Sequence, residues 1–376
     1  MSLKKLIELS NRYGGNAEYV LAGGGNTSYK DESYLHVKRS GAALAGITTG
    51  GFVKIDRAKL GRVFSAAYPE EPQAREAAVL RDMLAARCAG EEQKRPSVEA
   101  LLHHAMPFAY VLHIHPARAN GLTCGRNGEA AMRALFPGQA LWIPQTMPGY
   151  ILAKEARQRI LDHQKKGGRP PRRLFLENHG VFIGGDTVED IDAAVAGMED
   201  ALAGVIVRTP DFATCEFDKQ KAVRFARAVE NLAARRGFCV FHTNRELAKA
   251  LSSREAFSRV RMTFTPDHLV YCGAEGLFIA SADLESACSE LAEKTQTYEM
   301  RHRRLPNIIG LRDTGIYARG ESQKEADAAM ALFLDALKIA VYAESFGGAK
   351  PMEPRLADAI GNWEAERFRK HGYNSI

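Results

Sequence analysis

The stretch that decides the fold is Tyr110-Val111-Leu112-His113-Ile114-His115-Pro116. Its apolar residues predict a short strand that is closed by the proline. Successive side chains of a strand point to opposite faces, so His113 and His115 are expected to project side by side. Two neutral imidazoles at that spacing can both bind one divalent metal ion. Because the chain has 11 histidines, such a pair also arises by chance, and the metal interpretation depends on what else the chain supplies.

A third histidine and a glutamate occur at positions from which they could join the His113–His115 pair. The apolar run Leu174–Leu176 ends in Glu177-Asn178-His179-Gly180, and Val181–Ile183 continues it, so His179 is expected in a strand beside a glycine. Backbone and side chains can crowd around an ion at such a position. Glu99 falls in the first turn of a helix that begins at Pro96-Ser97. A glutamate there ordinarily interacts with the helix dipole, and it reaches His113 only if the segment folds back.

A glycine-rich segment precedes these residues. Gly23-Gly24-Gly25-Asn26-Thr27-Ser28 is followed by an alternating strand, Tyr34–Lys38, and then by Ser40-Gly41. Glycines let the backbone approach a ligand, and backbone amides with Asn, Ser and Lys donors suit a phosphate. A hairpin turn rich in glycine is the structural alternative, and the segment alone does not decide between the two.

Composition narrows the class of protein. The chain has 376 residues, of which 45% are hydrophobic and 26% charged, as in a globular protein of two domains or one large one. It contains no apolar run of 18 residues and no signal-peptide core, and its six scattered cysteines favour a reducing, cytoplasmic location. The net charge of +6 is too small for its size to predict nucleic-acid binding, but it favours an anionic substrate.

Five short motifs occur in an order and spacing that resemble the class II aldolase/adducin family. The motifs are Gly25–Ser28, Ser40-Gly41, Pro96–Glu99, His113–Pro116 and Asn178–Gly180. The resemblance covers roughly residues 1–210 and implies an α/β fold, a three-layer α/β/α domain around a mostly antiparallel sheet. It also implies a divalent metal, usually zinc, bound by His113, His115 and His179, with Glu99 as the catalytic acid/base.

The same resemblance implies a phosphate-binding site formed by four residues, Asn26, Ser40, Gly41 and Ser97. Sugar-phosphate aldolases of the family often have a second serine before the glutamate, and here that position is Val98. The cradle therefore has one hydroxyl fewer than expected, and Lys38 is expected to compensate for it.

Over its whole length the chain also resembles the aldolase half of rhamnulose-1-phosphate aldolase/short-chain dehydrogenase fusion proteins. Thr265–His268 and Trp363–Glu366 carry this resemblance. It implies a homo-oligomeric zinc aldolase that cleaves a sugar phosphate reversibly to dihydroxyacetone phosphate and an aldehyde, without nucleic-acid or membrane partners. A sugar-phosphate epimerase or decarboxylase on the same metal scaffold is the alternative. A non-catalytic adducin-like binding module is a third, and it is disfavoured because all three histidines are present.

The second half repeats part of the first. Residues 174–202 align with residues 309–337, with ten of the 29 positions identical and with Gly180 over Gly315 and Gly185 over Gly320. Asp313-Thr314 replaces Asn178-His179 in the second copy, and no H-x-H precedes it. We therefore expect a catalytic domain over residues 1–210 and a degenerate aldolase-like α/β domain without metal ligands over residues 211–376.

Overall fold

The structure is a computed structural model that describes residues 2–232, 237–361, 363–364 and 368. The chain divides into two compact units. The first unit comprises residues 1–123, 127–205 and 362–376, and the second comprises residues 124–126 and 206–361. Ala365 and Glu366, which belong to the fusion-like stretch near the end of the chain, lie outside the described residues.

The first unit is built on a seven-stranded sheet whose strands follow the order β3-β2-β1-β4-β7-β6-β5. The pair β5 and β6 is parallel, and the other pairs are antiparallel. The strand bounds are β1 Asn26–Lys30, β2 Tyr34–Lys38, β3 Phe52–Asp56, β4 Tyr110–Ile114, β5 Ala140–Ile143, β6 Arg173–Leu176 and β7 Gly180–Gly185. Every residue of the central strand β4 is buried, which explains why its sequence is almost continuously apolar.

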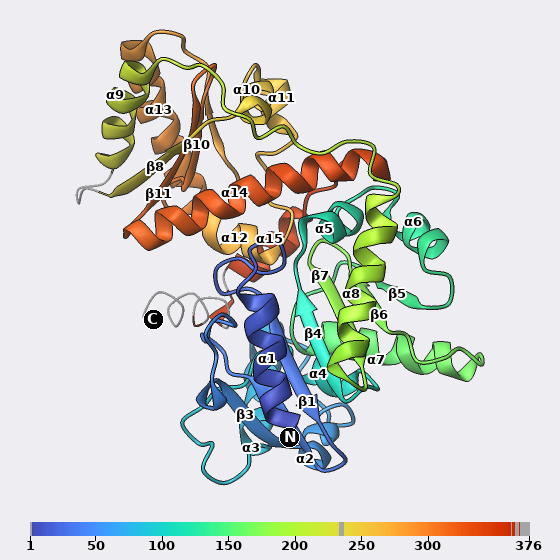
Figure 1. The fold of residues 1–376 in the computed structure, drawn as a ribbon. Helices are drawn as coiled ribbons and strands as arrows, with labels where there is room; N and C mark the ends of the chain where they lie inside the picture. The colour runs from blue at the N-terminus through green and yellow to red at the C-terminus, as the bar shows by residue number, and fades with distance from the viewer. Residues whose placement is uncertain (1, 233–236, 362, 365–367, 369–376) are drawn as a thin grey trace. The chain divides into compact units, whose positions relative to one another are not determined.

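Helices cover both faces of this sheet. Helices α1 (Ser2–Gly14), α5 (Ala117–Thr123) and α8 (Val188–Ala203) lie on one face, and α2 (Arg57–Arg62), α4 (Ala100–Ala105) and α7 (Tyr150–Lys165) lie on the other (Figure 1). The remaining elements of the unit are η1 (Thr49–Gly51), α3 (Pro72–Ala85) and α6 (Gly128–Leu135). The result is the three-layer α/β/α arrangement with a mostly antiparallel sheet that the family resemblance implies.

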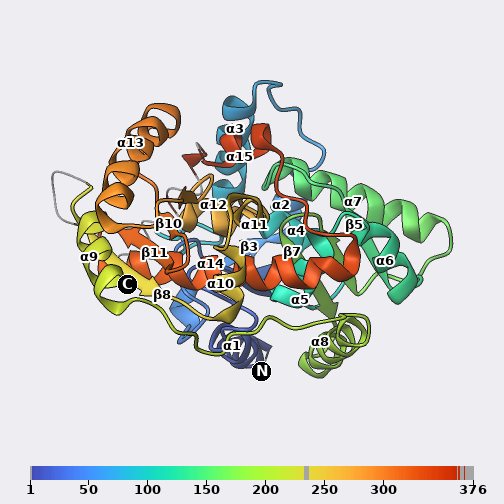
Figure 2. The same cartoon turned by 90° about the horizontal axis from the view of Figure 1, so that it is seen from above.

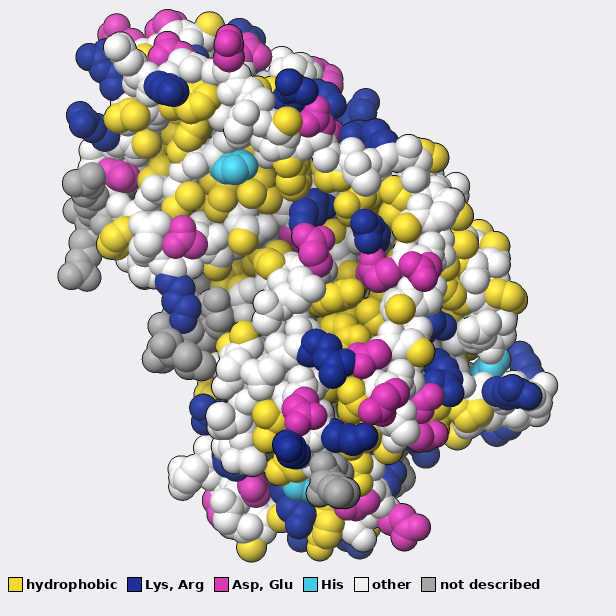
Figure 3. Space-filling view, viewed as in Figure 1, with side chains coloured by type: hydrophobic (Ala, Val, Ile, Leu, Met, Phe, Trp, Pro, Cys, Tyr) yellow, Lys and Arg dark blue, Asp and Glu magenta, His cyan; other side chains and the backbone are white. Residues whose placement is uncertain are grey.

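Helices α1 and α8 show how the sequence places this outer layer. Thr187 and Asp190 form a reciprocal capping box that begins α8, and such a box satisfies two backbone donors at the helix end. Charged side chains of α1 pair with those of α8, as Lys5 does with Glu189 at 3.4 Å. On the face drawn in Figure 3, basic and acidic side chains lie next to one another over these helices. None of the helices in the described part of the chain is long and apolar enough to cross a membrane.

The second unit has a four-stranded sheet in the order β8-β11-β10-β9. The strands are β8 Phe238–His242, β9 Leu277–Ile279, β10 Ile308–Leu311 and β11 Gly315–Gly320. Helices α9 (Lys219–Glu230) and α13 (Leu284–His302) lie beside each other on one face, and α14 (Gln323–Ala343) lies on the other (Figure 2). The smaller elements are α10 (Arg245–Ala250), α11 (Arg254–Ser258), α12 (Pro266–Cys272), η2 (Glu344–Phe346) and α15 (Pro354–Gly361).

This second sheet repeats the strand order and strand directions of β4-β7-β6-β5. In both sets of four strands the last pair is parallel and the other two pairs are antiparallel. The bounds of β6 and β7 and the start of α8 coincide with those of β10, β11 and α14 after a shift of 135 residues along the sequence. Asn178 and Asp313, which correspond under this shift, both have a φ of 55°. The sequence similarity of the two segments is thus accompanied by the same local structure.

Two local predictions were wrong. Leu174–Leu176 and Val181–Ile183 do not form one strand, because β6 ends at Leu176 and turns back into the antiparallel β7. His179 therefore lies in a tight turn, where Asn178 adopts the left-handed conformation that asparagine tolerates better than most residues. The helix expected from Pro96-Ser97 begins only at Ala100. The glycine-rich segment leads into a strand, β1, which the sequence analysis did not predict, and four of the five residues of this strand are buried.

Candidate metal centre

His113 comes from the central strand β4 and is completely buried. Its ring stacks on that of Phe182 in the neighbouring strand β7, with the ring centroids 4.0 Å apart. Its Nδ1 atom lies 3.1 Å from the carbonyl oxygen of Val181, and a carbonyl can only accept a hydrogen bond. Nδ1 therefore carries the proton, and the lone pair of Nε2 remains for a metal ion.

His115 follows directly after β4, and its side chain lies on the same side as that of His113. Its backbone N–H donates to the carbonyl oxygen of Tyr19 at 3.0 Å, which continues the extended chain beyond the strand. The Nε2 atoms of His113 and His115 are 2.9 Å apart. Two nitrogens that bind one zinc ion tetrahedrally at about 2.0–2.1 Å are about 3.3 Å apart, so the two rings are within a few tenths of an ångström of that spacing.

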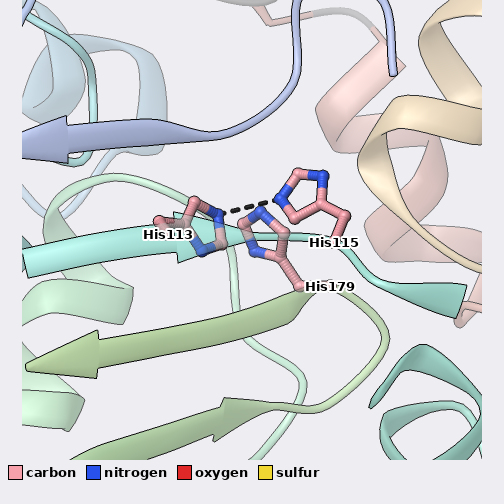
Figure 4. A group of neighbouring side chains, drawn as sticks. All are labelled: His113, His115 and His179. Atoms are coloured by element: carbon pink, nitrogen blue, oxygen red, sulfur yellow. Dashed lines mark hydrogen bonds between the residues drawn. The ribbon is translucent and has the colours of Figure 1, made fainter. Parts of the chain in front are cut away.

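His179 completes the group from the turn between β6 and β7. The ligand nitrogens of His113, His115 and His179 all lie within 4.8 Å of one another, and the three rings point toward a common centre (Figure 4). Gly180 permits this approach, because a Cβ atom at its position would lie 2.5 Å from Cδ2 of His115. Within the part of the chain that the structure describes, this is the group of three or more His, Cys, Asp or Glu side chains that could hold a metal ion.

Glu99 stands beside the three imidazoles. It occupies the residue before α4 and makes no side-chain capping hydrogen bond within the described structure. Its Oε1 atom lies 3.4 Å from Nε2 of His113 and 3.5 Å from Nε2 of His179. This oxygen is buried and has no hydrogen-bond partner among the described residues. An orphaned carboxylate oxygen next to three convergent nitrogens fits a divalent cation, since burying such an oxygen without a partner is costly.

The residues predicted to bind phosphate line one cavity beside Glu99 and His179. They are Asn26, Lys38, Ser40, Gly41 and Ser97. Lys38 is only 4% exposed, and its backbone carbonyl accepts a hydrogen bond from the N–H of Ser97 at 3.0 Å. This bond and the one from the Ser40 N–H to the carbonyl of Arg95 join the end of β2 to the segment before α4. The chain thus brings three separate segments to one cavity that borders the histidines.

Asn26 also makes two side-chain hydrogen bonds that the sequence did not indicate. Its Nδ2 atom donates to Oε2 of Glu99 at 2.6 Å, and its Oδ1 atom hydrogen-bonds to Nε2 of His103. Ser28 lies two residues further along β1 and contacts the other ring nitrogen of His103 at 2.7 Å. The sequence analysis missed His103 and Ser28. The signal that could have identified them is the alternation of β1, which places Asn26, Ser28 and Lys30 on one face.

The second unit lacks these ligands at the corresponding positions. His242 pairs with Ile316 in its sheet as Ile114 pairs with Val181 in the first. Phe241 and Thr243 therefore occupy the places of His113 and His115, and Thr314 occupies the place of His179. The ring of Phe241 packs against Gly315, so an aromatic contact stands where the first unit has imidazoles.

These features describe an α/β protein with three convergent histidines that could hold a metal ion, and comparison with known families shows where it belongs. Residues 4–204 match the family model of the class II aldolase and adducin N-terminal domain. The chain belongs to this family, and the predicted family and three-layer fold are confirmed.

Individual relatives are distant. A curated protein of Bacillus subtilis (strain 168), the uncharacterized oxidoreductase YuxG, is 27% identical over 199 residues, which cover 50% of this chain and 27% of that protein. The chain thus spans about a quarter of this relative's length. An N-terminal class II aldolase domain from Thermoplasma acidophilum is 22% identical with a TM-score of 0.47 and covers 55% of this chain and 94% of its own. The L-fuculose-1-phosphate aldolase of Thermus thermophilus is 15% identical with a TM-score of 0.34, and the match covers 53% of this chain and 91% of that one.

Proposed function

We propose that this chain is a metal-dependent aldolase that cleaves a sugar phosphate such as rhamnulose 1-phosphate reversibly to dihydroxyacetone phosphate and an aldehyde. One observation carries the proposal. Three imidazoles converge beside a buried carboxylate, at the edge of a cavity that contains a buried lysine. This set can hold a divalent ion, we propose zinc, and an anionic substrate next to each other.

The proposed chemistry needs both the ion and the carboxylate. Breaking a carbon–carbon bond beside a carbonyl leaves an enediolate, which water stabilises poorly. A divalent ion held by His113, His115 and His179 would supply Lewis-acid stabilisation of negative charge on the substrate oxygens. Glu99 is assigned the proton transfer, because its Oε1 atom is buried and faces the three rings. Asn26 keeps the other oxygen of this carboxylate occupied.

The phosphate of the substrate is assigned to the cavity lined by Lys38, Ser40, Gly41 and Ser97. Gly41 has a φ of 80°, a conformation that lets its backbone approach a ligand closely. Lys38 adds a positive charge with which a phosphate dianion pairs. Because Val98 also lines the cavity in place of a hydroxyl, the lysine has a larger share of the binding than it would beside two serines.

An assay of product release tests this proposal. Zinc-loaded protein is offered ketose 1-phosphates, and dihydroxyacetone phosphate is measured with a coupled reductase. Release of this product supports the aldolase. Inversion at a carbon, or loss of carbon dioxide, without this product would assign the site to an epimerase or a decarboxylase, which the same ligands also serve. Protein that binds no divalent ion would overturn all three activities and favour a binding module.

We also propose that residues 1–210 form the catalytic domain and that residues 211–376 are a degenerate copy. The matching strand order and the matching bounds of β6–β7–α8 and β10–β11–α14 support a duplication. Phe241, Thr243 and Thr314 support the loss of the metal site. About one divalent ion per chain is then expected, and two would contradict the assignment. The six free cysteines fit the proposed cytoplasmic location. We further propose that the protein is a homo-oligomer, and sedimentation of the native protein tests its oligomeric state.

A further inference from the structure

A chain of hydrogen bonds runs from the inside of the first unit to the carboxylate of Glu99. It begins at Ser28, whose Oγ atom lies 2.7 Å from Nδ1 of His103. It continues from Nε2 of His103 to Oδ1 of Asn26 and from Nδ2 of Asn26 to Oε2 of Glu99 at 2.6 Å. His103 is completely buried in α4 and Ser28 is completely buried in β1. Its members are thus held away from water and in fixed positions.

The direction of each bond follows from the chemistry of its partners. An ionised carboxylate only accepts hydrogen bonds, so the amide nitrogen of Asn26 must face Glu99. The amide oxygen of Asn26 then faces His103, and Nε2 of His103 must carry the proton that it donates. Nδ1 of His103 is left with a lone pair, which accepts the hydroxyl proton of Ser28. The network therefore allows a single tautomer of a neutral imidazole.

The surroundings of His103 favour the neutral form. Its burial lowers its pKa well below the ordinary value, and the positive charges of Lys30 and Lys38 act in the same direction. Its backbone carbonyl accepts a hydrogen bond from Nζ of Lys30 at 2.8 Å, and its ring meets that of Phe182 edge to face at 5.1 Å. Neither contact uses the ring nitrogens, so the two nitrogens hydrogen-bond to Ser28 and Asn26.

We infer that His103 is a positioning residue that sets the orientation of the Asn26 amide and thereby aims the Glu99 carboxylate at the three metal-site imidazoles. Without the His103 proton, the amide of Asn26 can rotate by half a turn and present its oxygen to the carboxylate. Two acceptors would then face each other, and the carboxylate would swing away. The positioning stands on the geometry alone. Its consequence for turnover rests on the proposed function.

The first test needs neither metal nor activity. Nitrogen-15 NMR of the whole protein distinguishes the two neutral tautomers and the imidazolium of each histidine, and the His103 signals are assigned by their loss in His103→Gln. At neutral pH we expect a neutral ring with the proton on Nε2. A proton on Nδ1, or a positively charged ring, would overturn the inference.

The second test separates positioning from packing. His103→Leu keeps most of the volume but removes both hydrogen bonds. His103→Gln places an amide N–H near the position of Nε2. We expect kcat to fall about 10- to 100-fold in the leucine variant, because the charged hydrogen bond between Asn26 and Glu99 is no longer held in place. KM and metal content should stay within about twofold of the parent. The glutamine variant should recover most of the loss.

His104→Leu is the matched control, because His104 is the next residue of α4 and stacks on Phe64 instead. It should leave kcat unchanged. Equal losses in the glutamine and leucine variants, or none in either, would refute the positioning role. If the leucine variant does not fold, Ser28→Ala removes the bond to Nδ1 and should shift the tautomer signal. If the parent protein shows no aldolase activity, the proposed function fails while the tautomer measurement still decides the inference.

Discussion

Replacing Glu99 by glutamine should abolish most turnover and leave the protein folded and loaded with metal. Oε2 of Glu99 accepts one hydrogen bond from Asn26 at 2.6 Å, and the glutamine oxygen can still accept it. The loss of charge in that bond is worth on the order of 1 kcal/mol, which is small against a typical stability of about 5–15 kcal/mol. Loss of an acid/base group costs about 10²–10⁴-fold in rate, or roughly 3–5 kcal/mol of barrier.

The expected loss of stability is small and the expected rise of the reaction barrier is large, so one set of measurements can distinguish an unfolded variant from an inactive one. The assay compares kcat, metal content and the midpoint of urea unfolding for the parent and for Glu99→Gln. Glu76→Gln is the matched control, since Glu76 is a largely buried carboxylate of the same unit that pairs with Arg75 at 3.5 Å and does not line the cavity. Turnover of Glu99→Gln within a few-fold of the parent would refute the acid/base role. A parallel loss of metal would show that the carboxylate is a ligand instead.

Three further changes test other parts of the site and its support. His179→Ala should lower metal occupancy well below that of the parent, whereas His163→Ala, which removes a ring bonded to a backbone carbonyl, should not; elemental analysis decides. Lys38→Ala should raise KM for a ketose 1-phosphate about 10- to 150-fold at unchanged metal content, and inorganic phosphate should compete in the parent. Burial, followed by repulsion from Arg57, lowers the pKa of Lys30 to about 7. Above that pH the unfolded chain binds more protons at Lys30 than the folded protein does, so the free energy of unfolding should rise with pH. From pH 7 to pH 9 we expect a rise that is on the order of 2 kcal/mol larger in the parent than in Lys30→Met, measured by urea unfolding.

The group of three histidines could be predicted in part because the geometry of two of its members is local. The spacing of His113 and His115 follows from the period of a strand, and β4 ends at Ile114, two residues before the proline that was expected to close it. The family motif added His179, which the structure brings to the same point. The mostly antiparallel sheet came from the family resemblance, because strand pairing between distant segments leaves no mark in the pattern of a single strand.

The orientation of Glu99 could not be predicted from the sequence. It depends on the pairing of β1 with β4, where Asn26 lies opposite His113, and on the packing of α4 over that face. Asn26 and Glu99 are 73 positions apart in the sequence, so no local pattern connects them. The turn at His179 was missed for a different reason. An apolar run interrupted by Asn178 and Gly180 has the pattern of one strand, and only the left-handed φ of Asn178 reverses the chain.

Comparison of the two units distinguishes the residues that form the turn after β6 and β10 from the residues that a metal ion would require. Asn178 and Asp313 share a left-handed φ, and Gly180 and Gly315 both admit a ring where a Cβ would collide. These turn features persist although Thr314 has replaced His179. The turn is therefore a requirement of the strand–turn–strand–helix segment, and the histidine is not. The three imidazoles and Glu99 of the first unit are not needed to form the four strands that the two units share, since the second unit forms the corresponding four strands without them. The proposed binding of a divalent ion and its chemistry would account for that set of side chains.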